Sequence, residues 1–406
     1  MAASLRPLLP LALLAACAPD LVAIPAEGGA GDATAQADVA SSTDAATTTD
    51  ATAPADVVTA PPDVQTTPPD VVTTAPDVVT APPDVVTAPD VATAPPDVVT
   101  APPDASVGPV FNYAASGPNA VEVWNGPVPG TEGNARVFYP RGGGGARFPL
   151  VVFAHGFQLN VSNFDVLLRH VAAWGYVVAS VDYPGTILGT DHRDVASAIR
   201  AARASFAMGR VSGFPAAASV DAARAVAMGH SLGGKAAIMA ILDDAAFVAG
   251  VALDPVDDNA VGRVDDAHPS VAPERMGALR VPLALFGASQ SRCGFLGQSC
   301  APEASNWQTF ARSAPSGARV ATYPLLRFGH NDFVDTSCGL PCLACARGAA
   351  PLTTRELAVR ALTVGFLERY TKDVRSAQAY VDGAVRDSLV STGVLWDGSA
   401  PLPPCN

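Results

Sequence analysis

Basic residues are almost missing from the first quarter of this chain, where Arg6 stands alone, and aromatic residues are scarce throughout. Phe, Trp and Tyr make up 6% of the 406 residues, and residues 18–110 hold 14 acidic residues but neither Lys nor Arg. The formal net charge of −13 belongs to this N-terminal part, since residues 111–406 carry 24 residues of each sign. A basic nucleic-acid-binding surface is excluded, because such binding depends on clustered Lys and Arg.

The apolar run near the N-terminus is too short to span a bilayer, which takes about 20 apolar residues. Residues 1–16 contain one positive charge, Arg6, followed by a leucine-rich stretch, as in a secretory signal. The stretch ends in LAAC at residues 14–17, which resembles the lipobox of bacterial lipoproteins, where the signal is cut before a lipid-bearing cysteine. We therefore expect export and a lipid anchor on Cys17 at the bacterial cell surface, and Ala18 favours the outer membrane. The alternative is an ordinary signal peptide in which Cys17 is incidental.

Residues 17–108 are predicted to be a disordered linker. A unit close to APPDVVT recurs between residues 53 and 107, with one Asp about every seven residues. The period is that of a coiled coil, but a proline in every unit removes helix donors and clashes with the preceding turn. An extended, polyproline-like tether accounts better for this composition.

Residues 109–406 alternate strand-like and helix-like segments, which predicts one α/β domain with a mostly parallel sheet flanked by helices. The expected strands are 136–139, 149–155, 176–182, 223–229, 248–253, 281–287 and 320–326. The expected helices are 162–175 with Ser162 as its cap, 191–209, 233–246, 306–313, 353–372 and 377–390.

The sequence GHSLG at residues 229–233 fits the pattern G-x-S-x-G. It stands between an expected strand and an expected helix, the context that defines a nucleophile elbow. In that turn the serine hydroxyl is exposed at the end of the sheet, and the following helix directs its N-terminus at a developing oxyanion. We therefore predict that Ser231 is a nucleophile.

The sequence HGF at residues 155–157 closes an earlier expected strand. In this arrangement the N–H groups of Phe157 and Leu232 are predicted to form the oxyanion hole, where loss of one donor typically raises the barrier by about 2.7–4 kcal/mol. Phe157 and Gln158 are also expected to contact the substrate. We expect His155 to be structural, because the site needs one general base.

The general base is expected late in the chain, since the order in such hydrolases is serine, acid, histidine. His330 stands just beyond the last expected strand and is our candidate. The other candidates fit less well, since His170 and His192 fall within expected helices and His268 in a polar loop.

The acid is expected at Asp254, directly after the strand 248–253, where rigid support would present it to the base. The strand 281–287 is followed by no carboxylate before Glu303. The competing carboxylates are Asp257, Asp258 and Asp332.

These motifs together resemble the chlorophyllases and the platelet-activating-factor acetylhydrolase-like bacterial esterases over residues 136–383. The resemblance rests on HGF at 155–157, GHSLGGK at 229–235, LDPV at 253–256 and GHND at 329–332. It implies an α/β-hydrolase fold and ester hydrolysis without metal or cofactor. The chain departs from the chlorophyllases at Leu232, where that family carries arginine, and this argues against chlorophyll as the substrate.

Besides Cys17 the chain has six cysteines, an even number that suits three disulfides in an oxidising compartment. A local Cys293–Cys300 pair is the first expectation, with the remaining cysteines pairing among themselves. These are Cys338, Cys342, Cys345 and Cys405. The alternative is a zinc site made by Cys338, Cys342 and Cys345.

We therefore predict a monomeric serine esterase acting on a small-molecule or lipid ester. The same triad would serve a lipase or a cutinase-like polyester hydrolase, and the non-enzymatic alternative is a surface-displayed binding module. Residues 257–275 are interpreted as a solvated loop rather than a lid or a calcium loop. The aromatic and aliphatic residues near the motifs suit either a pocket or the core, namely Phe157, Leu159, Phe164 and Phe286.

Overall fold

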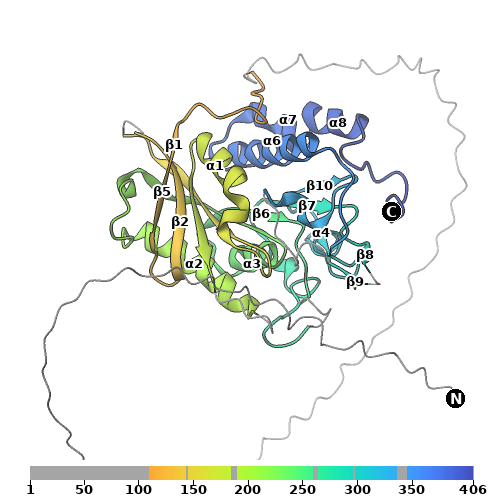
Figure 1. Cartoon of the computed structure of the whole chain (residues 1–406), viewed down its shortest axis with the longest axis horizontal. Helices are drawn as coiled ribbons and strands as arrows, with labels where there is room; N and C mark the ends of the chain where they lie inside the picture. The colour runs from red at the N-terminus through yellow and green to blue at the C-terminus, as the bar shows by residue number, and fades with distance from the viewer. Residues whose placement is uncertain are drawn as a thin grey trace, which may run out of the picture. The chain divides into compact units, whose positions relative to one another are not determined.

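The strands join into an eight-stranded sheet in which the β1–β2 and β2–β4 pairs are antiparallel and the remaining pairs are parallel. The computed structural model describes residues 109–142, 145–183, 190–258, 264–295, 298–335 and 345–405 (Figure 1). The predicted signal and tether, including Cys17, lie outside these ranges. Across the sheet the strands are β1 (Val121–Pro127), β2 (Glu132–Pro140), β4 (Val177–Asp182), β3 (Phe148–Ala154), β5 (Val220–His230), β6 (Phe247–Leu253), β7 (Leu283–Ala288) and β10 (Val320–Leu325).

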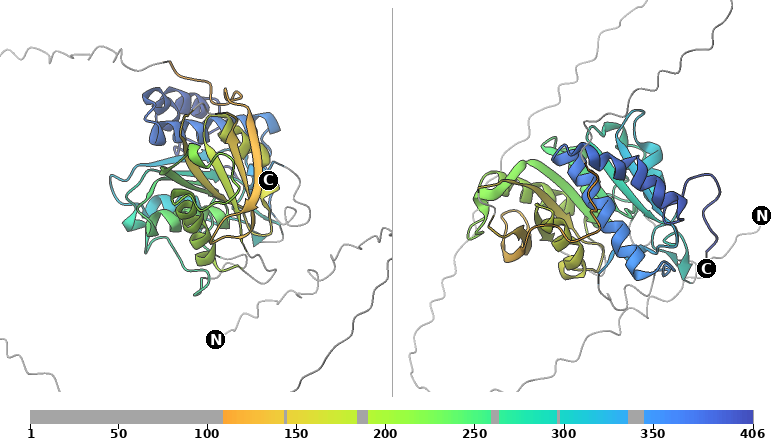
Figure 2. Two further views of the ribbon diagram at one scale, coloured as in Figure 1. Left: turned by 90° about the vertical axis from the view of Figure 1, so that its left-hand side faces the viewer. Right: turned by 90° about the horizontal axis from the view of Figure 1, so that it is seen from above.

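Helices cover both faces of the sheet, as the two further views in Figure 2 show. Successive residues of a strand point to opposite faces. In β3, Val152 and Ala154 pack with α2 and α3, whereas Val151 and Phe153 pack with α1 and α6. The helices are α1 (Asp165–Ala173), α2 (His192–Ala207), α3 (Leu232–Asp243), α4 (Trp307–Ser313), α6 (Leu352–Thr371), α7 (Gln378–Val381) and α8 (Ala384–Ser391).

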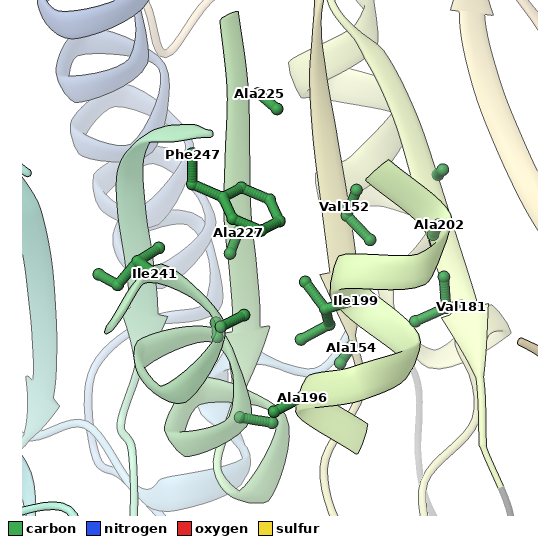
Figure 3. Packing of buried hydrophobic residues seen from close by; sticks show 14 of the residues in the cluster. Val152, Ala154, Val181, Ala196, Ile199, Ala202, Ala225, Ala227, Ile241 and Phe247 are labelled. Atoms are coloured by element: carbon green, nitrogen blue, oxygen red, sulfur yellow. The ribbon is translucent and has the colours of Figure 1, made fainter. Parts of the chain in front are cut away.

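The core between the sheet and the helices α2 and α3 is built from small and β-branched side chains (Figure 3). Ile199 of α2 and Ile241 of α3 are buried there, and alanines such as Ala196 and Ala202 let α2 approach closely. Gly250 of β6 lies under Ile241, whose Cδ1 would be 2.7 Å from a Cβ at that position. The α/β class predicted from the sequence is thereby confirmed, with a mostly parallel sheet and flanking helices.

Several predicted boundaries are wrong in instructive ways. Ser162 does not cap α1. The Asn160 side chain accepts the Ser162 N–H and caps a 3-10 helix, η2 (Val161–Phe164), which leads into α1 at Asp165. The expected helix 377–390 is interrupted at Gly383, whose extended backbone separates α7 from α8. The edge strand β1 was not predicted at all.

Candidate active site

The candidate site lies where parallel strands end together. β3 runs into His155, β5 ends at His230 before Ser231, and β6 ends at Leu253 before Asp254. Adjacent registers pair Ala154 with Gly229 and His230 with Leu253. Because carboxyl ends of parallel strands meet at one edge, the predicted motifs converge there.

Ser231 occupies a strained turn between β5 and α3, with φ of 56° and ψ of −119°. Such a conformation is costly for a residue with a side chain and is typical of functional sites. The flanking glycines make the turn possible, because a Cβ on Gly229 would lie 2.2 Å from the Gly233 carbonyl oxygen. A Cβ on Gly233 would lie 2.1 Å from the Ala154 carbonyl oxygen. The spacing of G-x-S-x-G therefore follows from close backbone packing.

The His330 imidazole stands between the serine and an aspartate. Its Nε2 is 2.9 Å from Ser231 Oγ, and its Nδ1 is 2.7 Å from Asp254 Oδ2. A neutral ring protonated at Nδ1 donates to Asp254 and can accept the Ser231 proton at Nε2. His330 belongs to the 3-10 helix η5 (His330–Phe333) and is only 5% exposed.

Asp254 is fully buried and is held by main-chain groups as well as by the histidine. Its Oδ1 accepts the Ala288 N–H at 3.0 Å, and its own N–H donates to the Phe286 carbonyl at 2.9 Å. The ends of β6 and β7 thus position the carboxylate, which leaves Oδ2 free to face His330. Like Ser231, Asp254 has a positive φ, here 44°.

The competing carboxylates have other partners. Asp257 faces the buried Lys235 and accepts the N–H groups of Val271 and Ala272. Asp258 accepts the Ser305 hydroxyl at 2.7 Å. The third competitor, Asp332, accepts the Gly329 N–H and pairs with Arg355. Among the described carboxylates, Asp254 is the one that contacts the His330 ring.

The loop after β3 lies directly against the serine. A Cβ on Gly156 would be 3.3 Å from Ser231 Cβ, so this glycine gives close access to the nucleophile. Within the described ranges, the main-chain N–H groups of Phe157 and Leu232 have no hydrogen-bond acceptor. Gln158 follows in the left-handed region with φ of 56° and is exposed. Donors are therefore available next to Ser231 Oγ.

His230, which precedes the nucleophile, is a site residue that the sequence did not reveal. It is fully buried, and its Nε2 donates to the His330 carbonyl oxygen at 2.9 Å. Burial, together with the neighbouring His330, lowers the pKa of His230 well below its usual value, so the ring stays neutral. Its variable position in G-x-S-x-G carries no signal of this contact.

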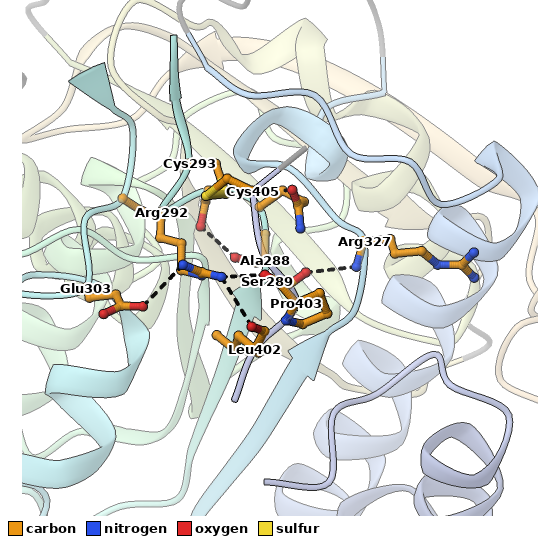
Figure 4. The surroundings of a disulfide bond; sticks show 12 residues. Ala288, Ser289, Arg292, Cys293, Glu303, Arg327, Leu402, Pro403 and Cys405 are labelled. Atoms are coloured by element: carbon orange, nitrogen blue, oxygen red, sulfur yellow. Dashed lines mark hydrogen bonds and ion pairs between the residues drawn. A yellow bond between two sulfur atoms is a disulfide. The ribbon is translucent and has the colours of Figure 1, made fainter. Parts of the chain in front are cut away.

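The disulfides differ from the expected local pairing. Cys293 pairs with Cys405 and Cys300 with Cys345, so the predicted Cys293–Cys300 bond is wrong. In Figure 4, Arg292 beside the first bond donates to the carbonyls of Leu402 and Pro403, which fixes the C-terminal segment. The second bond also contradicts a zinc site that uses Cys345. Cys338 and Cys342 lie outside the described residues.

The second disulfide reinforces the histidine loop. The N–H groups of Ala349 and Ala350, just beyond Cys345, donate to the Arg327 carbonyl at 2.7 and 3.0 Å. A Cβ on Gly329 would lie 2.4 Å from the Ala346 carbonyl oxygen, so this segment packs tightly against the residue before His330. Cys300–Cys345 joins that segment to the loop after β7.

Other expected site features prove to be structural. Phe164 and Phe286 are fully buried in the core with α1 and α6, whereas Phe157 and Leu159 are partly exposed. The stretch 257–275 is not simply a solvated loop, since Val271 has no exposed surface.

No group of three or more metal-ligating side chains occurs in the described parts of the chain, and no helix there is long and apolar enough to cross a membrane.

The sheet order, the serine turn after β5 and the histidine after β10 define an α/β-hydrolase. The Chlorophyllase family model matches residues 121–385, and the chain belongs to this family. Chlorophyllase-1 of Arabidopsis thaliana is 27% identical over 202 residues, which cover 46% of this chain. The match spans 60% of that relative's length. Family membership suggests an ester hydrolase of the α/β-hydrolase type.

Proposed function

We propose that this protein is a serine carboxylic ester hydrolase that works through an acyl-enzyme. The observation that carries the proposal is the continuous hydrogen-bonded line from Ser231 Oγ through His330 to Asp254, with distances of 2.9 and 2.7 Å. A nucleophile, a base and an orienting acid in this order are what acyl transfer requires.

In the acylation step, Ser231 Oγ attacks the ester carbonyl carbon while His330 Nε2 takes the hydroxyl proton. Negative charge then develops on the carbonyl oxygen, and the N–H groups of Phe157 and Leu232 stabilise it. Asp254 holds the imidazole in the tautomer that accepts at Nε2 and stabilises the imidazolium. Collapse of the tetrahedral intermediate breaks the bond to the alcohol oxygen, which receives the proton from His330.

Deacylation repeats these roles with water. His330 removes a proton from a water molecule, whose oxygen attacks the acyl carbon, and the carboxylic acid leaves as Ser231 Oγ regains its proton. Each residue is used twice, and Phe157 and Leu232 stabilise both tetrahedral intermediates. The two-step reaction consumes one water molecule per ester and assigns no step to a cofactor.

The proposed substrate is a small-molecule or lipid carboxylic ester, with Phe157 and Gln158 contacting it beside the nucleophile. Chlorophyll, the ester that the relative's name implies, is disfavoured by Leu232 at the position where chlorophyllases carry arginine. Turnover of short-chain esters without turnover of chlorophyll is the expected profile. Faster turnover of emulsified or polymeric esters than of soluble short-chain esters would instead indicate a lipase or a polyester hydrolase.

The proposal extends to location. A lipid on Cys17 would hold the protein at the outer surface of a bacterial membrane, with residues 17–108 as a spacer between the anchor and the catalytic domain. Two or more acyl chains give stable attachment, whereas one gives marginal binding. Cys17→Ala should move the protein from the membrane fraction to the soluble fraction without altering ester turnover.

The test of function uses the chain expressed with export into an oxidising compartment. Parent, Ser231→Ala, Asp254→Asn and His330→Ala are compared for fluorophosphonate labelling and for turnover of p-nitrophenyl esters of graded chain length. We expect labelling at Ser231, losses of about 10⁶-fold in kcat for Ser231→Ala and about 10⁴-fold for Asp254→Asn.

A folded parent that neither labels nor turns over any ester would overturn the proposal and favour a surface-binding module. Near-parental turnover in Asp254→Asn, with labelling intact, would instead show that a different carboxylate orients His330. Circular dichroism of each variant separates loss of chemistry from loss of fold.

A further inference from the structure

The peptide group between Gly156 and Phe157 is held by three donors. The Gly156 carbonyl oxygen accepts from His155 Nδ1 at 2.9 Å, from Tyr183 Oη at 3.3 Å and from the Leu159 N–H at 3.1 Å. A carbonyl with this many partners has a fixed direction. The main chain beside Ser231 is therefore oriented by neighbouring side chains as well as by its own turn.

Fixing this carbonyl also fixes the N–H on the other side of the same peptide bond. The bond is trans, and in a trans peptide the C=O and N–H point in opposite directions. The Phe157 N–H consequently points away from His155 and Tyr183. It has no acceptor among the described residues, and Gly156 lies against Ser231, so the N–H is available to a substrate oxygen there.

Tyr183 is built into this loop by several contacts. Its single hydroxyl proton is shared between the His155 carbonyl at 2.6 Å and the Gly156 carbonyl at 3.3 Å, and its ring stacks on the His155 ring at 4.2 Å with 19° between planes. Burial raises the pKa of Tyr183 well above its usual value, so the hydroxyl remains a donor. Both of its acceptors are carbonyls of the loop after β3.

Asp182 completes the arrangement from the end of β4. Its Oδ1 is 3.1 Å from His155 Nε2 and accepts the Tyr183 N–H at 3.1 Å. β3 and β4 are adjacent and parallel, with Ala154 opposite Val181, so His155 and Asp182 come next to each other as the strands end. Both ring nitrogens of His155 thus lie within hydrogen-bond distance of oxygen atoms, Nδ1 of the Gly156 carbonyl and Nε2 of Asp182.

We propose that Tyr183, His155 and Asp182 form a positioning group that aims the Phe157 N–H at the oxygen of the reacting ester. This inference rests on the proposed esterase function and deepens it. None of the three residues touches the reacting atoms, and they act through the Gly156–Phe157 peptide. Tyr183 contributes most directly, because its hydroxyl binds two consecutive carbonyls of the loop.

Tyr183→Phe tests the proposal, because it removes one oxygen and keeps the ring that stacks on His155. Loss of a whole oxyanion donor costs about 10²–10³-fold in kcat, and loosening one should cost less, about 10-fold. KM should stay within about twofold. Affinity for an aryl boronic acid, which becomes tetrahedral on the serine, should fall by the same factor as kcat/KM.

Tyr139→Phe is the matched control. Tyr139 is also buried, but it lies on β2, and its hydroxyl donates to Glu122 at 3.0 Å rather than to the loop at residues 155–159. This variant loses an equivalent hydroxyl and should keep parental kcat and boronic acid affinity. Any drop in melting temperature that both variants share reflects a lost hydrogen bond rather than positioning.

The outcomes separate the two proposals. An inactive parent contradicts the esterase function itself. An active parent with Tyr183→Phe unchanged in kcat and in boronic acid affinity, whatever its melting temperature, overturns the positioning role. If Tyr183→Phe does not fold, Asp182→Asn replaces it, since this side chain is half exposed. We expect that variant to lose about threefold in kcat and in boronic acid affinity together, and parental values for both would overturn the proposal.

Discussion

His230 Nε2 donates a hydrogen bond to the main-chain carbonyl oxygen of His330, 2.9 Å away, across 100 residues of sequence. The residue beside the proposed nucleophile thus holds the backbone of the proposed base. The centroids of the two imidazole rings lie 4.9 Å apart, and Phe333 packs on the His230 ring. The elbow and the histidine loop are therefore linked directly, independently of the contact between Ser231 and His330.

His230→Phe should slow catalysis by about 10-fold at pH 8 with little change in KM, because His330 loses the hydrogen bond that fixes its main chain. His230→Gln keeps a donor and should recover part of the rate. Steady-state kinetics on a short-chain ester gives the comparison. Parental kcat in His230→Phe would show that the link has no catalytic consequence.

The same residue should make the parent acid-sensitive. The pKa of His230 is lowered in the folded chain, so the unfolded state binds the extra proton as pH falls below about 6.5. The free energy of unfolding therefore falls as pH decreases below that value. Urea unfolding between pH 5 and 8 should show a steeper loss for the parent than for His230→Phe, and parallel curves would contradict the assignment.

Asp335 should give the opposite dependence. Its Oδ2 accepts the N–H groups of Val166 and Leu167 at the start of α1, and burial raises its pKa to about 6. The folded state then binds more protons than the unfolded state between about pH 4 and 6, so this contribution is lost as pH rises through about 6. The free energy of unfolding of Asp335→Asn should rise relative to that of the parent over that interval, by about 3 kcal/mol at most. A constant difference in unfolding free energy from pH 4 to 7 would rule this out.

Gly233→Ala should abolish activity and destabilise the fold, because its Cβ would lie 2.1 Å from the Ala154 carbonyl oxygen. The start of α3 would have to move away from β3, which carries Ser231 away from the loop at Gly156. Gly277→Ala is the control, since a Cβ there meets nothing within 4 Å. Melting temperature and fluorophosphonate labelling are measured for both, and full labelling of Gly233→Ala would contradict the packing argument.

Removing the Cys300–Cys345 bond should affect catalysis before it affects global unfolding. Closing a 45-residue separation contributes about 4 kcal/mol in the chain-entropy description, and this bond also braces the loop around His330. Cys300→Ser with Cys345→Ser should therefore lose ester turnover at lower urea than it loses helical circular dichroism.

Cys293→Ser with Cys405→Ser is the matched control for the disulfide prediction, since this bond ties the C-terminal segment to the loop after β7. Its activity and circular dichroism should decline together. Coincident transitions in both double variants would mean that the Cys300–Cys345 bond stabilises the whole fold and has no particular effect on the histidine loop.

Residue patterns along the chain were sufficient to predict the sheet class and most strands, because short continuous apolar runs reflect burial of a strand on both faces. The candidate site residues also came from local context. Ser231 was expected from two glycines and a strand-to-helix switch, and Asp254 and His330 from their places just after strands.

Only the tertiary structure decided which distant groups meet. Disulfide partners depend on Cα positions that long-range packing sets, so Cys300 pairs with Cys345 rather than with its sequence neighbour Cys293. The contacts of Asp335 with α1, of His230 with His330 and of Tyr183 with the Gly156 carbonyl likewise join segments that are separated in the sequence. A local pattern specifies the backbone of its own segment, whereas these contacts require the complete sheet to bring the segments together.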